Sequence, residues 1–156
     1  MDFKEYVKLA MKTNVEDRSF QDNILNGLLG LCGETIEFLT ASEDGKLDEL
    51  GDCYWYTALL FHTTGLELLN ITKAKNSLMS SIGLLSDHFK KHFFQGHSLD
   101  SNLVQVLLSD IKFRLDVSTT FINSSPEEVM EHNINKLKKR FPEGFEVEKS
   151  INRKGN

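Results

Sequence analysis

Two pairs of acidic residues, each set three apart in an apolar helical pattern, constrain this chain more than any other feature. Glu34 and Glu37 form the first pair, and Glu49 and Asp52 form the second after eleven intervening residues. Residues three apart share one face of a helix, so each pair places two like charges about one turn apart. Converging carboxylates suit a hard cation such as Mg²⁺. Because a single acidic pair is common on solvated helix faces, the hypothesis of a metal site depends on the doubled pattern.

Small residues accompany both acidic pairs. Gly30 and Gly33 lie inside the apolar pattern, where a glycine costs roughly 1 kcal/mol relative to alanine. Gly51 stands between the two acids of the second pair. We interpret these glycines as positions at which two helices approach each other closely.

The rest of the sequence favours an all-α fold. A length of 156 residues suits one domain, 1–156, and is enough for a real hydrophobic core. Only two prolines occur and alternating β-branched residues are scarce. Ser125, Pro126 and Glu128 form a capping-box start for the last helix. The predicted helices cover about 3–13, 20–41, 46–64, 67–93, 100–123 and 126–140.

Apolar spacing predicts which helix faces are buried. In the helix over 20–41 the expected core stripe follows the helical period, with the acidic pair to one side. In the helix over 46–64, Glu49, Asp52 and Tyr56 share a face away from the core. The expected core residues are Leu25, Leu28, Leu29, Cys32, Ile36 and Leu39 in the first of these helices, and Leu47, Leu50, Tyr54, Ala58 and Phe61 in the second.

Composition excludes several classes of protein. With a net charge of −5, we expect no nucleic-acid partner. Cys32 and Cys53 both fall in apolar helical patterns, so we expect reduced core cysteines and no disulfide scaffold or zinc site. No apolar run reaches about 18 residues and the first residues do not form a signal peptide, so we expect a cytoplasmic protein with no membrane partner.

The motifs resemble those of a known family. The run L-x-G-L-x-G-E-x-x-E, followed by D-E-L-G-D-x-x-W-Y, resembles the MazG-like all-α nucleoside triphosphate pyrophosphohydrolases, whose superfamily includes the dimeric dUTPases and the dCTP pyrophosphatases. The segment N-I-N-K-L-K-K-R-F-P-E-G-F resembles the closing segment of the same family. The resemblance implies a MazG-like helical bundle that hydrolyses a nucleoside triphosphate (NTP or dNTP) to a monophosphate and pyrophosphate.

The resemblance also implies roles for the acidic residues. Glu34, Glu37, Glu49 and Asp52 would bind Mg²⁺, or Mn²⁺ in its place. Glu34 or Glu37 would also orient or deprotonate the attacking water, and the sequence does not decide between them.

Residues outside the acidic pairs are candidates for binding the substrate. Lys136 and Arg140 would neutralise phosphate charge, with Asn133 donating a hydrogen bond beside them; a solvated basic face near a helix C-terminus is the alternative. Tyr56 is a candidate for stacking on a base, or else a core or interface tyrosine. Asn26 matches a position that is often asparagine in relatives.

The segment 83–123 echoes the segment 30–64. G-L-C-G-E-T-I-E-F at Gly30 aligns with G-L-L-S-D-H-F-K-K at Gly83, and L-G-D-C-Y-W at Leu50 aligns with L-S-D-I-K-F at Leu108. A real repeat would make the chain a fused pseudo-dimer, with a complete acidic hairpin at about 20–64 and a degenerate hairpin at about 73–123 that supplies walls to the site. Chance similarity between two amphipathic hairpins is the alternative.

Three functional hypotheses remain open from the sequence. The first is a Mg²⁺-dependent pyrophosphohydrolase that controls or cleans the nucleotide pool, and the second is a dUTPase-like enzyme directed at a pyrimidine dNTP. The third is a helical nucleotide-binding or regulatory module without turnover. A di-iron bundle is disfavoured because its Glu-x-x-His pairs are missing from the acidic hairpin. We expect a homodimer or a higher homo-oligomer, since hairpins of this kind expose apolar faces.

Overall fold

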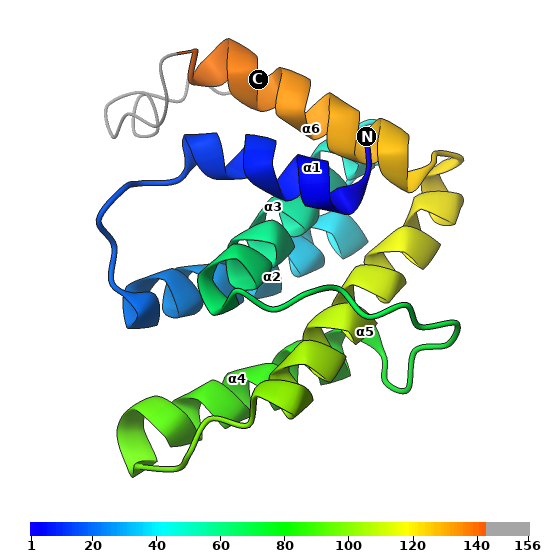
Figure 1. The fold of residues 1–156 in the computed structure, drawn as a ribbon. Coiled ribbons are helices and arrows are strands. Elements are labelled where there is room, and N and C mark those ends of the chain that lie inside the picture. Colours follow the sequence, from blue (N-terminus) through cyan, green and yellow to red (C-terminus); the bar gives the residue numbers. More distant parts are fainter. Residues whose placement is uncertain (143–156) are drawn as a thin grey trace.

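A computed structural model describes residues 1–142 and shows only helices and loops in that range (Figure 1). The all-α prediction is therefore confirmed. The single-domain prediction over 1–156 also covers residues 143–156, which lie outside the described part. Short 3₁₀ turns follow α1 at Met11–Thr13 and α5 at Thr120–Ile122. The α-helices are α1 (Phe3–Ala10), α2 (Phe20–Thr40), α3 (Lys46–Thr64), α4 (Leu78–Gln95), α5 (Ser101–Thr119) and α6 (Pro126–Arg140).

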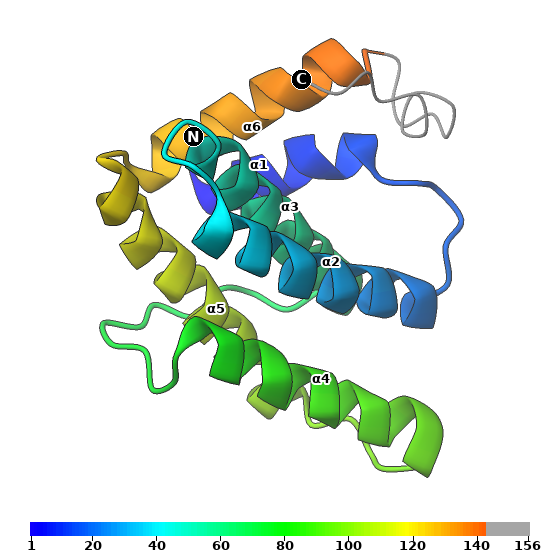
Figure 2. The same ribbon diagram turned by 180° about the vertical axis from the view of Figure 1, so that it is seen from behind.

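The helices form three layers (Figures 1 and 2). The α2–α3 hairpin lies in the middle, the α4–α5 hairpin packs on one side of it, and α1 and α6 pack on the other. One hydrophobic core joins these layers. Its largest fully buried side chains include Tyr6, Ile24, Leu50, Tyr54, Phe89 and Leu108.

Polar side chains set where the helices begin. Ser19 caps α2 by accepting a hydrogen bond from the Asp22 N–H. Ser125 and Glu128 form the predicted capping box at the start of α6, with Pro126 in the first turn. At the other end of the hairpin, Gly65 ends α3 in a left-handed conformation with φ of 66°. The predicted boundaries of these helices are confirmed.

The predicted helix over 67–93 is wrong in its first part. Residues 66–77 form an irregular segment, the strap, and α4 begins only at Leu78. Side chains of α5 hold the strap in place of intrahelical bonds. Asp110, which is 2% exposed, accepts the backbone N–H groups of Lys75 and Asn76 at 3.0 and 3.1 Å. Tertiary hydrogen bonds thus override a local helical pattern.

The predicted core stripe of α2 is also largely wrong. Of its six residues only Leu28 is buried, and Leu29 is 74% exposed. A second apolar face, about a quarter turn away, packs inward instead. Gly27 lies on this buried face. Its lack of a side chain lets α3 pack closely, because a Cβ there would stand 2.6 Å from Leu60 Cδ2. The buried residues of α2 are Ile24, Gly27, Leu28, Leu31, Thr35 and Phe38.

The other predicted stripe residues of α2 form an apolar strip on its outer side, exposed except at the half-buried Leu25, and we call this strip the outer α2 face. Cys32, expected in the core, is exposed on this face, whereas Cys53 is buried as predicted. In α3 the predicted core is confirmed for Leu50, Tyr54, Ala58 and Phe61. The outer α2 face consists of Leu25, Leu29, Cys32, Ile36 and Leu39.

Candidate functional site

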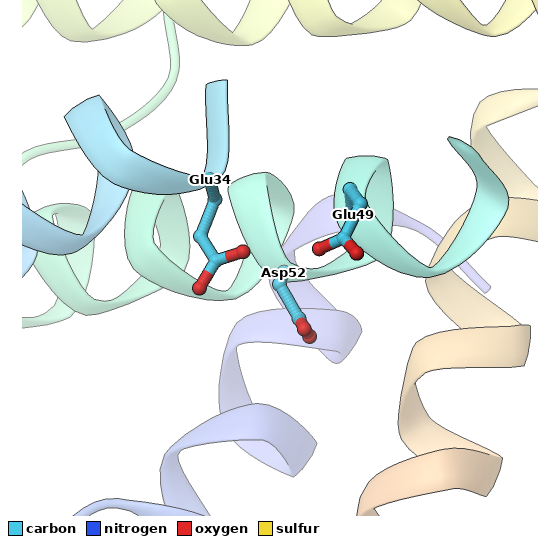
Figure 3. Close-up of side chains that lie close together, drawn as sticks. All are labelled: Glu34, Glu49 and Asp52. Atoms are coloured by element: carbon cyan, nitrogen blue, oxygen red, sulfur yellow. The ribbon is translucent and has the colours of Figure 1, made fainter. Parts of the chain in front are cut away.

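Three of the four predicted carboxylates come together. Glu34 reaches from α2 toward Glu49 and Asp52 on α3, and each offers an oxygen within 4.8 Å of the other two (Figure 3). All three residues are partly buried. Glu37 is exposed and lies outside this group, although its charge acts on Glu34 and Glu49. We call Glu34, Glu49 and Asp52 the acidic cluster.

Two of the three glycines noted in the sequence have a packing role at this site. A Cβ at Gly30 would overlap the ring of Tyr56, so the tyrosine ring lies directly against the α2 backbone. A Cβ at Gly51 would stand 3.0 Å from the Asn133 side chain, so this glycine admits α6 rather than α2. Nothing lies within 4 Å of a Cβ at Gly33, and the prediction of a close approach there is wrong.

Burial and the neighbouring negative charges cause the Glu34 carboxyl in the acidic cluster to retain a proton. Burial, followed by the charges of Asp52, Glu37 and Glu49, raises the pKa of Glu34 from 4.5 to about 8. Burial also raises the pKa of Glu49, and a side-chain hydrogen bond links the Glu34 and Glu49 carboxyls. At neutral pH the metal-free protein therefore holds a proton where like charges would otherwise repel.

Two side chains of α6 bind the Asp52 carboxylate. Asn133 Nδ2 donates to Asp52 Oδ1 at 2.9 Å, and Lys136 Nζ lies 2.9 Å from both carboxylate oxygens. Lys136 also donates to the backbone carbonyl of Asp48 at 3.3 Å. Both residues were expected to bind substrate, but the structure directs them toward Asp52. Asn133 is fully buried, which leaves it no surface for a ligand.

Asp48 forms a second ion pair beside the acidic cluster. His132 Nε2 lies 2.7 Å from Asp48 Oδ1, and Lys136 Nζ lies 3.6 Å from the same oxygen. Burial opposes ionisation of Asp48, but the His132 hydrogen bond and the Lys136 charge hold its pKa below the usual value. Asp48 therefore stays ionised and shares Lys136 with Asp52.

A cavity of about 250 Å³ opens next to the acidic cluster. Glu34 and Asp52 line one part of it, and Tyr56, Asn26 and Arg140 line others, so these predicted residues meet at one site. None of the lining residues comes from α4 or α5. The second hairpin therefore supplies no wall to this cavity, contrary to what the fused pseudo-dimer hypothesis implied.

Arg18 lines the same cavity and was missed in the sequence. It lies in the polar loop before α2, where no periodic pattern draws attention to a single arginine. Within residues 1–142 neither Arg18 nor Arg140 has an ion-pair partner, although the Arg140 guanidinium stands over the Phe141 ring. Two arginines from distant parts of the chain thus line the same cavity as Glu34 and Asp52.

The donor set fits Mg²⁺ or Mn²⁺. The three carboxylates provide only oxygen ligands, which these hard cations prefer, and the adjoining cavity leaves room for water and for oxygens of a substrate. Across residues 1–142 no second group of three acidic, histidine or cysteine side chains is placed to bind a metal.

Comparisons with protein-family models, with curated proteins and with solved structures found no match for this chain. None of the helices in residues 1–142 combines the length and apolar character needed to cross a membrane.

Proposed function

We propose that the protein is a divalent-metal-dependent hydrolase that cleaves a nucleoside triphosphate between its α- and β-phosphates. The observation that carries this proposal is the acidic cluster beside a cavity that also presents Arg18 and Arg140. Carboxylates alone would repel a triphosphate, whereas a cation held between them and two guanidinium groups would attract it. The resemblance of the motifs to MazG-like enzymes supplies the type of reaction.

Each residue then has a role that follows from its position. Glu34, Glu49 and Asp52 would hold Mg²⁺ or Mn²⁺, which neutralises phosphate charge when bound. Arg18 and Arg140 bind phosphate oxygens, Arg140 as expected from the sequence. Water adds to one phosphorus atom of the α–β bridge as the bridging P–O bond breaks. The other fragment leaves with that bond's electrons, and it is pyrophosphate if the α-phosphorus is attacked and the nucleoside monophosphate if the β-phosphorus is attacked.

The proton lost by the attacking water passes to a carboxylate. Glu37 is suited to this step because it is exposed one turn from Glu34 and is outside the acidic cluster. Glu34 remains the other candidate. Tyr56 and Asn26 line the cavity where the nucleoside would lie. We place this activity in control of the cytoplasmic nucleotide pool.

The proposal is tested by a hydrolysis panel of the common NTPs and dNTPs, with dUTP included, in the presence and absence of Mg²⁺. We expect Mg²⁺-dependent release of pyrophosphate with the matching monophosphate. Release of orthophosphate with a diphosphate would contradict the proposed bond, and a preference for dUTP or dCTP would support the pyrimidine-directed alternative. A folded protein that binds Mg²⁺ and nucleotide without turnover would support the regulatory module.

We further propose that the protein forms a homodimer through the outer α2 face. Its residues Leu25, Leu29, Cys32, Ile36 and Leu39 are spaced four, three, four and three apart, as in the seam of a two-helix coiled coil. Leu29, Ile36 and Leu39 are 74%, 47% and 61% exposed in the single chain. A second copy related by a two-fold axis offers the same seam in return.

Substitution of both Leu29 and Ile36 by Glu is expected to give a monomer in sedimentation or light-scattering measurements at concentrations where the wild type is a dimer. Charges at two central seam positions would have to be buried without partners. Leu84→Glu on α4, where the leucine is 51% exposed, is the matched control and leaves the mass unchanged. A monomeric wild type would contradict the proposed interface.

A further inference from the structure

We infer that Tyr6 and Asn133 are positioning residues, which hold the Asp52 carboxylate in the orientation that binds the metal ion. This inference rests on the proposed function, because it concerns the hydrogen bonds that orient Asp52, one of the residues proposed to bind the metal ion. Tyr6 belongs to α1, a helix that carries no part of the sequence motifs.

Three side chains from three helices form a continuous hydrogen-bonded relay. The Tyr6 hydroxyl on α1 donates to Asn133 Oδ1 on α6 at 2.8 Å. Asn133 Nδ2 then donates to Asp52 Oδ1 on α3 at 2.9 Å. Because an ionised carboxylate only accepts, the Asn133 amide must turn its NH₂ toward Asp52 and its oxygen toward Tyr6. The relay therefore has one consistent direction, from hydroxyl to carboxylate.

The two donors of the relay are closed to water, whereas Asp52 at its end reaches the cavity. Tyr6 and Asn133 are both 0% exposed. Gly51 precedes Asp52 directly, and any side chain there would meet Cβ and Nδ2 of Asn133 at 3.0 Å. Position 51 is thus a glycine because the Asn133 side chain packs against it, although the two residues lie far apart in the sequence. Hydrogen bonds in such a dry site orient their acceptor strongly.

Lys136, one turn along α6 from Asn133, also binds Asp52. Lys136 Nζ contacts both oxygens of Asp52 and also reaches Asp48. Without the relay, only the flexible Lys136 side chain would hold the carboxylate, and it shares its ammonium with Asp48. Contacts that orient a metal ligand typically change metal affinity or activity by about 10- to 100-fold when they are removed.

The first test compares two tyrosine-to-phenylalanine variants. Tyr6→Phe removes only the hydroxyl that starts the relay. Tyr54→Phe is the matched control, since it removes the hydroxyl of another fully buried tyrosine. That hydroxyl lies 2.6 Å from Asp116 Oδ1, and the Tyr54 ring packs 6.3 Å from the Tyr6 ring. Both variants should lower the melting temperature. Only Tyr6→Phe should weaken Mn²⁺ binding, by about tenfold, in a calorimetric titration well below the melting temperature.

The second measurement is the Mg²⁺ dependence of turnover. We expect Tyr6→Phe to require about tenfold more Mg²⁺ for half-maximal rate and to approach the wild-type rate at saturating Mg²⁺, whereas a loss of folded protein would not be rescued in this way. Wild-type Mn²⁺ affinity in Tyr6→Phe, or equal weakening in Tyr54→Phe, would overturn the inference. A wild type that binds Mn²⁺ without hydrolysing nucleotides would contradict the proposed function alone, and the binding comparison would still decide on the relay. A wild type that binds no Mn²⁺ would overturn both.

Discussion

Glu34→Gln is expected to lower kcat/KM for nucleotide hydrolysis by about 10³-fold or more, while the metal-free protein keeps its fold. Glu34 is the only member of the acidic cluster on α2, so its loss leaves the proposed metal with ligands from α3 alone. The glutamine amide can still donate to Glu49, as the protonated Glu34 does in the metal-free protein. Turnover, Mn²⁺ titration and circular dichroism together measure these effects.

The same variant should change how stability depends on pH. Between about pH 4.5 and pH 8 the folded protein keeps a proton on Glu34 that the unfolded chain has released. The free energy of unfolding of the metal-free wild type therefore falls as the pH rises through this range, and the loss is complete above pH 8. It should amount to roughly 2 kcal/mol for a group partly screened by solvent. Glu34→Gln should flatten this dependence in denaturant titrations.

Asp87→Asn tests whether the site lies in the α2–α3 hairpin, as proposed, or in the α4–α5 hairpin. Asp87 aligns with Glu34 in the proposed repeat, but it is exposed and pairs with Lys90 and Lys91. Its substitution should leave both turnover and Mn²⁺ binding unchanged. If Asp87→Asn removed activity as fully as Glu34→Gln does, the assignment of the site to the first hairpin would be wrong.

Asp110→Ala is expected to cost about 3 kcal/mol of unfolding free energy and to lower the melting temperature by about 10 °C. Besides the two backbone N–H groups of the strap, Asp110 accepts hydrogen bonds from the Asn76 side chain at 3.2 Å and the Ser81 hydroxyl at 3.1 Å. Removing the carboxylate leaves all four donors without this acceptor in a buried place.

The matched variant is Asp110→Asn, which keeps the volume and one acceptor oxygen. Its loss of stability should be smaller than that of Asp110→Ala. In both variants the folded protein should keep wild-type Mn²⁺ affinity, because Asp110 lies outside the acidic cluster. A melting temperature of Asp110→Ala within 2 °C of the wild type would mean that the strap is held by other contacts.

Local signals were enough to predict most of the fold. Ser125 and Pro126 mark the start of α6, and Gly65 marks the end of α3, because caps and turns depend on neighbours in the sequence. The strap could not be predicted in this way, since the acceptor of its backbone donors, Asp110, lies more than thirty residues away. The faces of α2 were misassigned because two apolar stripes run along one helix and periodicity does not indicate which of them packs on α3.

The site was predictable to the extent that it depends on helical spacing. Spacing brought Glu49 and Asp52 together on α3 and indicated Glu34 on α2. Spacing also suggested Glu37, which the structure leaves exposed. The partners of Asn133 and the position of Arg18 depend on how α6 and the loop before α2 pack. No pattern within those segments encodes that packing.

The three-layer arrangement has a consequence for synthesis of the chain. The acidic cluster is complete once α3 has left the ribosome, but Lys136 and Arg140 arrive only with α6, the last described helix. A nascent chain that ends before α6 would carry the carboxylates without the ammonium that neutralises Asp52 or the asparagine that orients it. Removal of α6 from the finished protein would recreate that state while leaving Glu34, Glu49 and Asp52 in place.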